Sequence, residues 1–197
     1  MKRLILILLC LQFIFTTCKK ESIIPLTNGN NNTGDDSDLS IGDIHQGGVI
    51  FYLDSTGQHG FVCDFKDLGI VGWGCHDTLI SGADGIGIGN GYQNTIDIEL
   101  GCAKSNTAAD YCANSSAQGY NDWFLPSKDE LNQIYLNKDT IQLTNGVSSF
   151  SSTIYWSSSE SDNKHDYFDA WGQYFGNGFQ YGYDKSSSCL VIAIRSF

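Results

Sequence analysis

The sequence is short of basic residues, of long apolar runs and of closely spaced cysteine pairs, and each shortage excludes a class of function. Lysine and arginine number 11 against 22 aspartates and glutamates, which gives a formal net charge of −11. Such a surface repels nucleic acids, acidic lipid headgroups and sulfated glycans. It is compatible with neutral sugars, peptides, cations or basic protein partners, although solubility alone is a sufficient reason for the charge. We therefore expect no nucleic-acid partner.

The longest unbroken apolar run, residues 4–11, is too short to cross about 30 Å of hydrocarbon as a stable helix. It follows two basic residues and leads, within a few positions, to Cys18. This order is typical of a bacterial lipoprotein signal, in which the cysteine is acylated and becomes the mature N-terminus. We predict a signal peptide over residues 1–17, lipidation of Cys18, and an exported protein at the outer membrane or cell surface.

Two further features bear on this interpretation. Thr17 stands where lipoprotein signals more often carry Gly, Ala or Ser, so an ordinary secretory signal with a chance cysteine is the alternative. Residues 18–40 are rich in Asn, Gly and Asp and contain few apolar side chains, which predicts a disordered tether. Its start, Lys19-Lys20-Glu21, resembles the charged signals that send some lipoproteins of the Bacteroides group to the outer surface. The remaining residues, 41–197, suit one compact domain.

The seven cysteines fit an exported chain. Cys10 leaves with the predicted signal and Cys18 is the predicted lipid site, so an odd number remains and at most two disulfides can form. Cys102 and Cys112 are close in sequence, and Cys63 and Cys189 lie in apolar, strand-like runs. These four are the disulfide candidates, and the sequence leaves the connectivity open.

Metal chemistry has little support. No Cys-x-x-Cys pair occurs, and the four histidines, His45, His59, His76 and His165, show no ligand spacing. The glycine-dense segment that ends at residue 91 lacks the lysine of a nucleotide-binding loop. We therefore predict no metal site, no cofactor and no catalytic residue.

The domain alternates strand and helix patterns. Residues 47–54 and 61–65 predict a β-hairpin, residues 66–91 a loop, and residues 93–100 and 107–113 short helices. Residues 168–175 and 179–183 predict a second hairpin around Asn177-Gly178. The apolar run 189–195 predicts a single central strand.

The clearest local signal is a capping box at the start of a helix. Ser127 is followed three positions later by Glu130, and each side chain is placed to bond the backbone N–H of the other. Leu131, Ile134 and Tyr135 then form one apolar helical face. We therefore interpret Glu130 as a cap and not as a catalytic acid.

Two longer motifs carry a resemblance to a known family. The first is Gly119-Tyr-Asn-Asp-Trp-Phe-Leu-Pro-Ser127 followed by Glu130-Leu131, and the second is Tyr155-Trp-Ser-Ser-Ser-Glu160. With the closing Arg195, they resemble the C-terminal domain of bacterial collagen-like (Lcl-type) adhesins. The motif residues are Trp123, Pro126, Ser127, Glu130, Trp156, Glu160 and Arg195. The resemblance implies an α+β, C-type lectin-like fold with a twisted antiparallel sheet, a few short helices and long irregular loops.

Departures from related proteins limit what the resemblance implies. The calcium-holding Glu-Pro-Asn loop of sugar-binding C-type lectins is absent, and Asn121-Asp122-Trp123 has the lectin residues in the wrong order. The formylglycine-generating enzymes, which share that fold, need two nearby C-terminal cysteines, and only Cys189 lies there. We therefore expect neither a lectin-type calcium site nor that oxidase activity.

The favoured hypothesis is a non-catalytic, surface-anchored domain that binds a neutral glycan or a protein. Aromatic and amide side chains suit such contacts, and the candidates are Trp171, Gln173, Tyr181 and Tyr183. Trp123 and Trp156 are predicted to be core residues.

Three alternatives stay open. The first is a structural or assembly component of the envelope, for which the resemblance implies a possible trimer. The second, less favoured, is an enzyme of the formylglycine-generating superfamily. The third is a cation site formed by Asp162, Asp166 and Asp169, although we favour a solvated acidic loop there.

Overall fold

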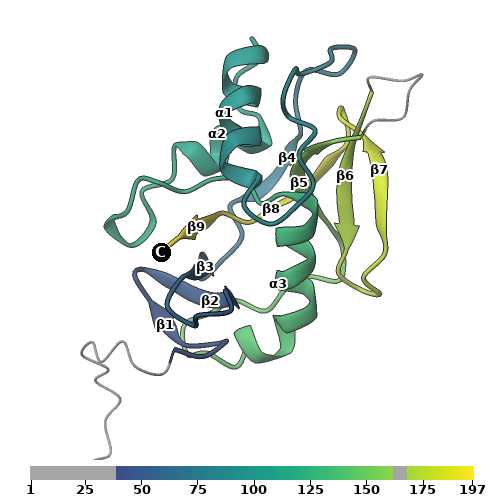
Figure 1. The fold of residues 1–197 in the computed structure, drawn as a ribbon. Helices are drawn as coiled ribbons and strands as arrows, with labels where there is room; N and C mark the ends of the chain where they lie inside the picture. The colour runs from purple at the N-terminus through teal and green to yellow at the C-terminus, as the bar shows by residue number, and fades with distance from the viewer. Residues whose placement is uncertain (1–38, 162–167) are drawn as a thin grey trace, which may run out of the picture. The chain divides into compact units, whose positions relative to one another are not determined.

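The computed structural model describes residues 39–161 and 168–197. Within these ranges, nine strands in two sheets and three α-helices form an α+β fold (Figure 1). The predicted α+β class is confirmed, with most strand pairs antiparallel, whereas the C-type lectin-like relationship stays a prediction. The predicted signal peptide, the lipid site Cys18 and nearly all of the tether lie outside the described residues. None of the helices within them is long and apolar enough to span a membrane.

The first sheet has the order β1-β2-β3-β9. Its strands are β1 (Ile44–His45), β2 (Gly48–Leu53), β3 (Gly60–Cys63) and β9 (Ile194–Ser196). The predicted first hairpin is confirmed as the antiparallel pair β2–β3. Phe51 and Ile50 belong to different core clusters, so β2 is covered on both faces. This double burial explains why β2 is an unbroken apolar run instead of an alternating one.

The second sheet has the order β4-β8-β5-β6-β7. Its strands are β4 (Gly69–Gly72), β8 (Ser188–Val191), β5 (Ile154–Glu160), β6 (Asp169–Tyr174) and β7 (Gln180–Asp184). The predicted second hairpin is confirmed as β6–β7. The prediction of a loop over residues 66–91 is wrong in part, because β4 lies within this range and pairs with β8. Gly69 and Gly72, at the two ends of this short strand, have low strand propensity, so the residue types do not predict a strand here.

The predicted single closing strand is also wrong. β8 pairs in the second sheet and β9 in the first, and the chain leaves the strand conformation at Ile192 and Ala193 between them. All residues from Cys189 to Arg195 are nevertheless buried. Continuous burial produces the apolar run in either case, so the sequence does not reveal the point at which the chain changes sheets. This segment joins the two sheets.

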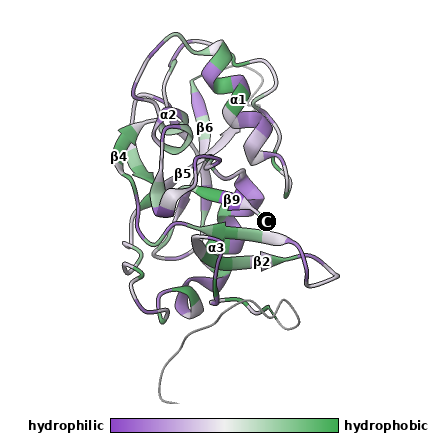
Figure 2. Cartoon of the chain, turned by 90° about the vertical axis from the view of Figure 1, so that its left-hand side faces the viewer, coloured by the Kyte–Doolittle hydropathy of each residue, from purple (hydrophilic) through white to green (hydrophobic). Residues whose placement is uncertain are grey.

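Helices cover the sheets, and both predicted short helices are confirmed. They are α1 (Gly91–Gly101) and α2 (Ala108–Ala113), followed by the 3-10 turn η1 (Ala117–Gly119) and then α3 (Lys128–Ile141). α3 packs against β2 of one sheet and β5 and β6 of the other. The capping box of α3 is confirmed, with the Glu130 backbone N–H donating to Ser127 Oγ at 3.3 Å. Apolar colouring is concentrated on strands such as β2, β4 and β9, whereas α1 carries both apolar and polar residues (Figure 2).

Candidate ligand-binding site

The two sequence motifs meet around residues 84–91, which we name the glycine loop. Ser159 Oγ at the end of β5 donates to the Gly85 carbonyl at 2.7 Å. The Ser127 hydroxyl at the start of α3 donates to the Gly87 carbonyl at 2.8 Å. The loop is therefore held from both sides by serines of the two motifs. Their shared role in this structure is to fix one irregular loop between β5, α1 and α3.

Glu130 completes this support from the interior. Its Oε2 accepts the Ser127 backbone N–H at 2.7 Å, and its Oε1 accepts the Gly89 N–H at 2.7 Å. Burial raises the pKa of the Glu130 carboxyl, while these backbone donors favour its charged form. A Cβ on Gly91 would lie 2.3 Å from Glu130 Oε2, so only glycine fits there. Glu130 is a cap of α3, as predicted, and also an anchor of the glycine loop.

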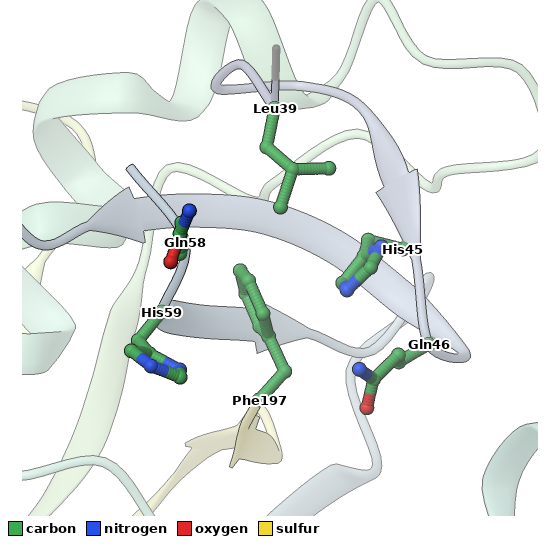
Figure 3. A pocket seen from close by; sticks show the side chains of 6 residues that line it. All are labelled: Leu39, His45, Gln46, Gln58, His59 and Phe197. Carbon is green, nitrogen blue, oxygen red and sulfur yellow. The ribbon is translucent and has the colours of Figure 1, made fainter. Parts of the chain in front are cut away.

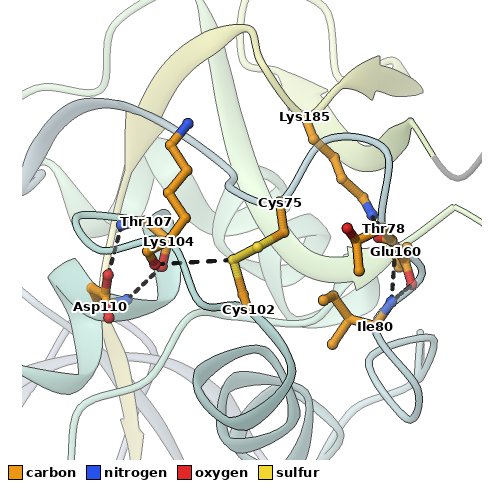
Figure 4. Close-up of a disulfide and its surroundings, with 9 residues drawn as sticks. All are labelled: Cys75, Thr78, Ile80, Cys102, Lys104, Thr107, Asp110, Glu160 and Lys185. Carbon is orange, nitrogen blue, oxygen red and sulfur yellow. Dashed lines mark hydrogen bonds and ion pairs between the residues drawn. A yellow bond between two sulfur atoms is a disulfide. The ribbon is translucent and has the colours of Figure 1, made fainter.

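A buried ion pair lies at the end of β5. Glu160 accepts a hydrogen bond from Lys185, whose Nζ also donates to the Thr78 carbonyl at 2.8 Å (Figure 4). Lys185 is fully buried, and its ammonium stands 4.7 Å from the centre of the Trp73 ring. Burial raises the pKa of the Glu160 carboxyl, and the Lys185 ammonium opposes that rise. The pair ties the strand β5 to the loop that precedes α1.

A cleft of about 160 Å³ opens above these supports. Trp171 of β6 lies on one side, and the Lys128 ammonium stands 3.7 Å from the centre of its ring. Asp84 and Ile86 of the glycine loop and Glu160 of β5 complete the lining. The cleft combines an aromatic ring, an exposed isoleucine, an ammonium donor and a carboxylate acceptor. This mixture suits a ligand with both hydroxyl groups and apolar faces.

The hairpin β6–β7 separates the four predicted binding residues. Trp171 pairs with Gly182 and Gln173 with Gln180, so these side chains share one face. Tyr181 and Tyr183 lie on the opposite face, because neighbouring strand residues alternate. The four do not form a single surface.

Their exposure also departs from expectation. Gln173 is fully buried and donates to Asn132 Oδ1 at 2.8 Å and to the Gly178 carbonyl at 3.0 Å, so the expectation that it is exposed is wrong. Tyr183 packs edge-on against Trp156 and is half-buried. Tyr181 is 46% exposed. Only Trp171 lines the cleft.

The remaining motif residues have structural positions. Trp123 and Trp156 are buried in the core, as predicted, and Pro126 accepts the Ser158 backbone N–H at 2.7 Å through its carbonyl. Arg195 donates to both Asp122 oxygens, at 2.7 and 2.8 Å, and to the Gln46 carbonyl at 2.7 Å.

The cysteine pairing differs from both suggested pairs. Cys75 and Cys102 form a disulfide (Figure 4). The other cysteines of the described residues, Cys63, Cys112 and Cys189, are buried free thiols. Cys102 is therefore paired, but with Cys75 and not with Cys112. Cys63 and Cys189 belong to β3 and β8, which lie in different sheets.

Sequence reasoning missed Asp84, Ile86 and Lys128. Lys128 lies inside the capping box, which accounts for the local sequence without a binding role, and the glycine loop carries no motif of a known ligand site. The density of glycines is the sequence signal that could have indicated this loop, because glycine often occurs where the backbone approaches its neighbours closely.

The histidines and the acidic group around Asp169 give less support for a binding site. A hollow of about 370 Å³ is lined by Leu39, His45, Gln46, Gln58, His59 and Phe197, and the Phe197 ring stands between the two histidines (Figure 3). His76 instead contacts Asp77 and Asp184. In residues 39–161 and 168–197, no three His, Cys, Asp or Glu side chains gather closely enough to hold a metal ion. Asp162, Asp166 and His165 lie outside the described residues, and Asp169 begins β6.

Comparison with known proteins places the chain in a family. Residues 78–195 match the Lcl C-terminal domain, so the chain belongs to the Lcl C-terminal domain family. The match includes both motifs, the glycine loop and every residue that lines the cleft. The family indicates a surface or adhesion-type domain. No curated protein matches the chain.

Proposed function

We propose that this protein is a lipid-anchored surface protein whose folded domain binds a neutral glycan or a protein without catalysing a reaction. The family supports the general class of surface or adhesion-type domain. The signal-like start and the cysteine at position 18 support the anchor. The proposal places recognition in the cleft beside Trp171.

The main support for that position is the pairing of Trp171 with Lys128. The Lys128 ammonium, 3.7 Å from the ring centre, makes a cation–π contact with the indole and adds a hydrogen-bond donor to the lining. Asp84 supplies an acceptor in the same lining. A pyranose ring presents hydroxyl groups at its edge and C–H groups on its faces, and this lining matches both.

Charge favours a neutral ligand over an acidic one. The chain has a formal net charge of −11, and two of the cleft residues, Asp84 and Glu160, are acidic. Lys128 is the basic residue in the lining, and it already contacts Trp171. A sulfated or phosphorylated ligand would therefore meet repulsion across the surface.

The test is an array of neutral glycans and host-matrix proteins probed with the protein, with and without calcium. We expect binding that does not need calcium and a loss of about ten-fold in affinity for Trp171→Ala, as for a typical aromatic contact residue. Tyr181→Ala is the matched control, because Tyr181 is an exposed aromatic on the other face of the hairpin. Loss of binding in Tyr181→Ala but not in Trp171→Ala would move the site to that other face.

An assembly role is the second candidate, and β7 is the feature that favours it. This strand is at the edge of its sheet, and its Tyr181 is 46% exposed. Phe179, directly before the strand, is 59% exposed. An aromatic edge strand is a surface on which another chain can add a strand. Silence across the arrays, together with a concentration-dependent oligomer that Tyr181→Lys abolishes, would favour this role over ligand binding.

A further inference from the structure

A groove on α1, separate from the Trp171 cleft, has a defined chemistry. Tyr92, Ile96 and Glu99 follow one another at helical spacing along one face of α1 and line it. The segment from Asn121 to Phe124 also lines it. The groove has a volume of about 330 Å³. Its lining is mostly apolar and aromatic and includes the carboxyls of Glu99 and Asp122.

The apolar part is built from aromatic rings that are fixed by packing. Tyr92 is 55% exposed and meets Phe124 edge-on, with ring centres 5.6 Å apart. The neighbouring Trp123 is nearly fully buried and donates its indole N–H to the Ala117 carbonyl at 3.1 Å. Leu100, near the end of α1, also lines the groove and is 82% exposed. The exposed side chains of Tyr92 and Leu100 offer apolar surface to an alkyl chain.

The lining contains two acidic residues, Glu99 on α1 and Asp122. Asp122 is already paired with Arg195, so it adds little free charge. Asp110 on α2 is not part of the lining but lies close enough to Glu99 to influence its pKa. The Cys112 thiol of α2 stays protonated, because burial raises its pKa well above 9.0. Glu99 is therefore the acidic residue of the lining that has no salt-bridge partner among the described residues.

We propose that this groove binds a lysine side chain presented by a basic segment of a partner protein. The alkyl stem lies along Tyr92, Ile96 and Phe124, and the ammonium meets Glu99. Lysine side chains commonly bury the stem and keep the charged head at a polar rim. The formal net charge of −11 attracts a basic segment toward this surface.

The carboxyl pair makes the binding depend on pH. Partial desolvation and the hydrogen bond with Asp110 raise the pKa of Glu99 to about 7, from an ordinary value of 4.5. Below that pH Glu99 holds a proton, which a lysine ammonium must displace. Above it, Glu99 is charged and accepts the ammonium directly. Affinity for lysine therefore rises as the pH increases through about 7.

The experiment is an NMR titration of the full chain with the capped pentapeptide Gly-Gly-Lys-Gly-Gly. A second capped peptide with norleucine in place of lysine keeps a similar stem and lacks the charge. We expect the lysine peptide to shift the Tyr92 and Trp123 signals and the norleucine peptide to bind more weakly. Glu99→Gln should weaken the lysine peptide by about three- to five-fold at a pH of about 8, in line with a half-exposed ion pair.

Two variants keep the test decisive. Asp139→Asn makes the same charge change at a carboxyl that is 84% exposed on α3, and should leave binding unchanged. Tyr92→Ala removes the aromatic wall, keeps both carboxyls and should weaken both peptides. The proposal is overturned if norleucine binds as well as lysine, or if wild-type affinity for lysine does not change with pH. Trp171→Ala should have no effect here, so failure of this proposal and failure of the proposed function are distinguishable.

Discussion

Buried carboxylates act as organisers at the scale of single residues. Glu130 is fully buried and bonds two backbone N–H groups from different segments. Glu160 is almost as buried and bonds Lys185 and the Ile80 N–H, the latter at 2.9 Å from Oε2. A buried charge is tolerated when it is paired and hydrogen-bonded in this way. Removing either partner of the Glu160–Lys185 pair would leave the other uncompensated.

Arg195 supports a residue-scale prediction. It forms a two-point contact with Asp122 and its guanidinium lies 3.9 Å from the centre of the Tyr120 ring. Lysine cannot reproduce a planar, two-point contact or the stacking. We expect Arg195→Lys to lower the free energy of unfolding by roughly 1–2 kcal/mol at neutral pH, with Asp122 half-exposed. Urea unfolding of both proteins measures the difference.

The same contact predicts a pH dependence. The hydrogen bonds from Arg195 hold the pKa of Asp122 below its ordinary value of 3.8. A lowered carboxyl pKa contributes stability at higher pH, and that stability is lost as the pH falls through the folded-state pKa. The difference in free energy of unfolding between wild type and Arg195→Lys should therefore become smaller in acid. The control compares Asp122→Asn with the double variant Asp122→Asn/Arg195→Lys, which lack the titrating carboxyl, so their difference in stability should not narrow in acid. A wild-type difference that widens in acid would contradict this account.

At the scale of elements, the disulfide joins a loop to a helix. Cys75 follows β4, Cys102 ends α1, and 27 positions separate them. The enclosed segment, residues 76–101, contains the glycine loop. The crosslink therefore limits the unfolded states of the part of the chain that lines the Trp171 cleft.

Removal of this disulfide is the element-scale prediction. The double variant Cys75→Ala/Cys102→Ala should be less stable than wild type by about 2–4 kcal/mol, as expected for a loop of this length. Thermal and urea unfolding measure the change. A reductant should destabilise wild type and leave the double variant unaffected, so an insensitive wild type would speak against the pairing.

At the scale of the whole molecule, one terminal segment joins two sheets. β8 and β9 belong to different sheets, and α3 packs against β2 of the first sheet and β5 and β6 of the second. Tyr155 of β5 and Ile192, between β8 and β9, belong to the same core cluster. The two sheets are therefore connected by the chain and by shared packing, which favours unfolding of the described domain as one cooperative unit.

The location of the whole molecule is also testable. In the proposed function, Cys18→Ser should remove acylation, shift the protein from the membrane fraction to the soluble fraction, and abolish labelling by a fatty-acid analogue. Cys10→Ser is the matched control, because Cys10 lies within the predicted signal and should keep both the label and the membrane location. An unlabelled wild type in the soluble fraction would exclude the lipid anchor.

The sequence by itself determined the local elements of this protein. The capping box of α3, the pair β2–β3 and the pair β6–β7 all follow from short-range hydrogen bonds, turn residues and apolar spacing. The family was also readable, since its motifs are continuous stretches of chain. In each case the interacting groups are neighbours in sequence.

Only the tertiary structure decided the features that join distant segments. The partner of Cys102, the burial of Gln173 and the division of the closing strand depend on how α1, α3 and the two sheets pack. The Trp171 cleft is built from β5, β6, α3 and the glycine loop, and no one of them carries its chemistry. Burial and charge pairing are properties of the surroundings, which side chains far apart in sequence create only when the chain is folded.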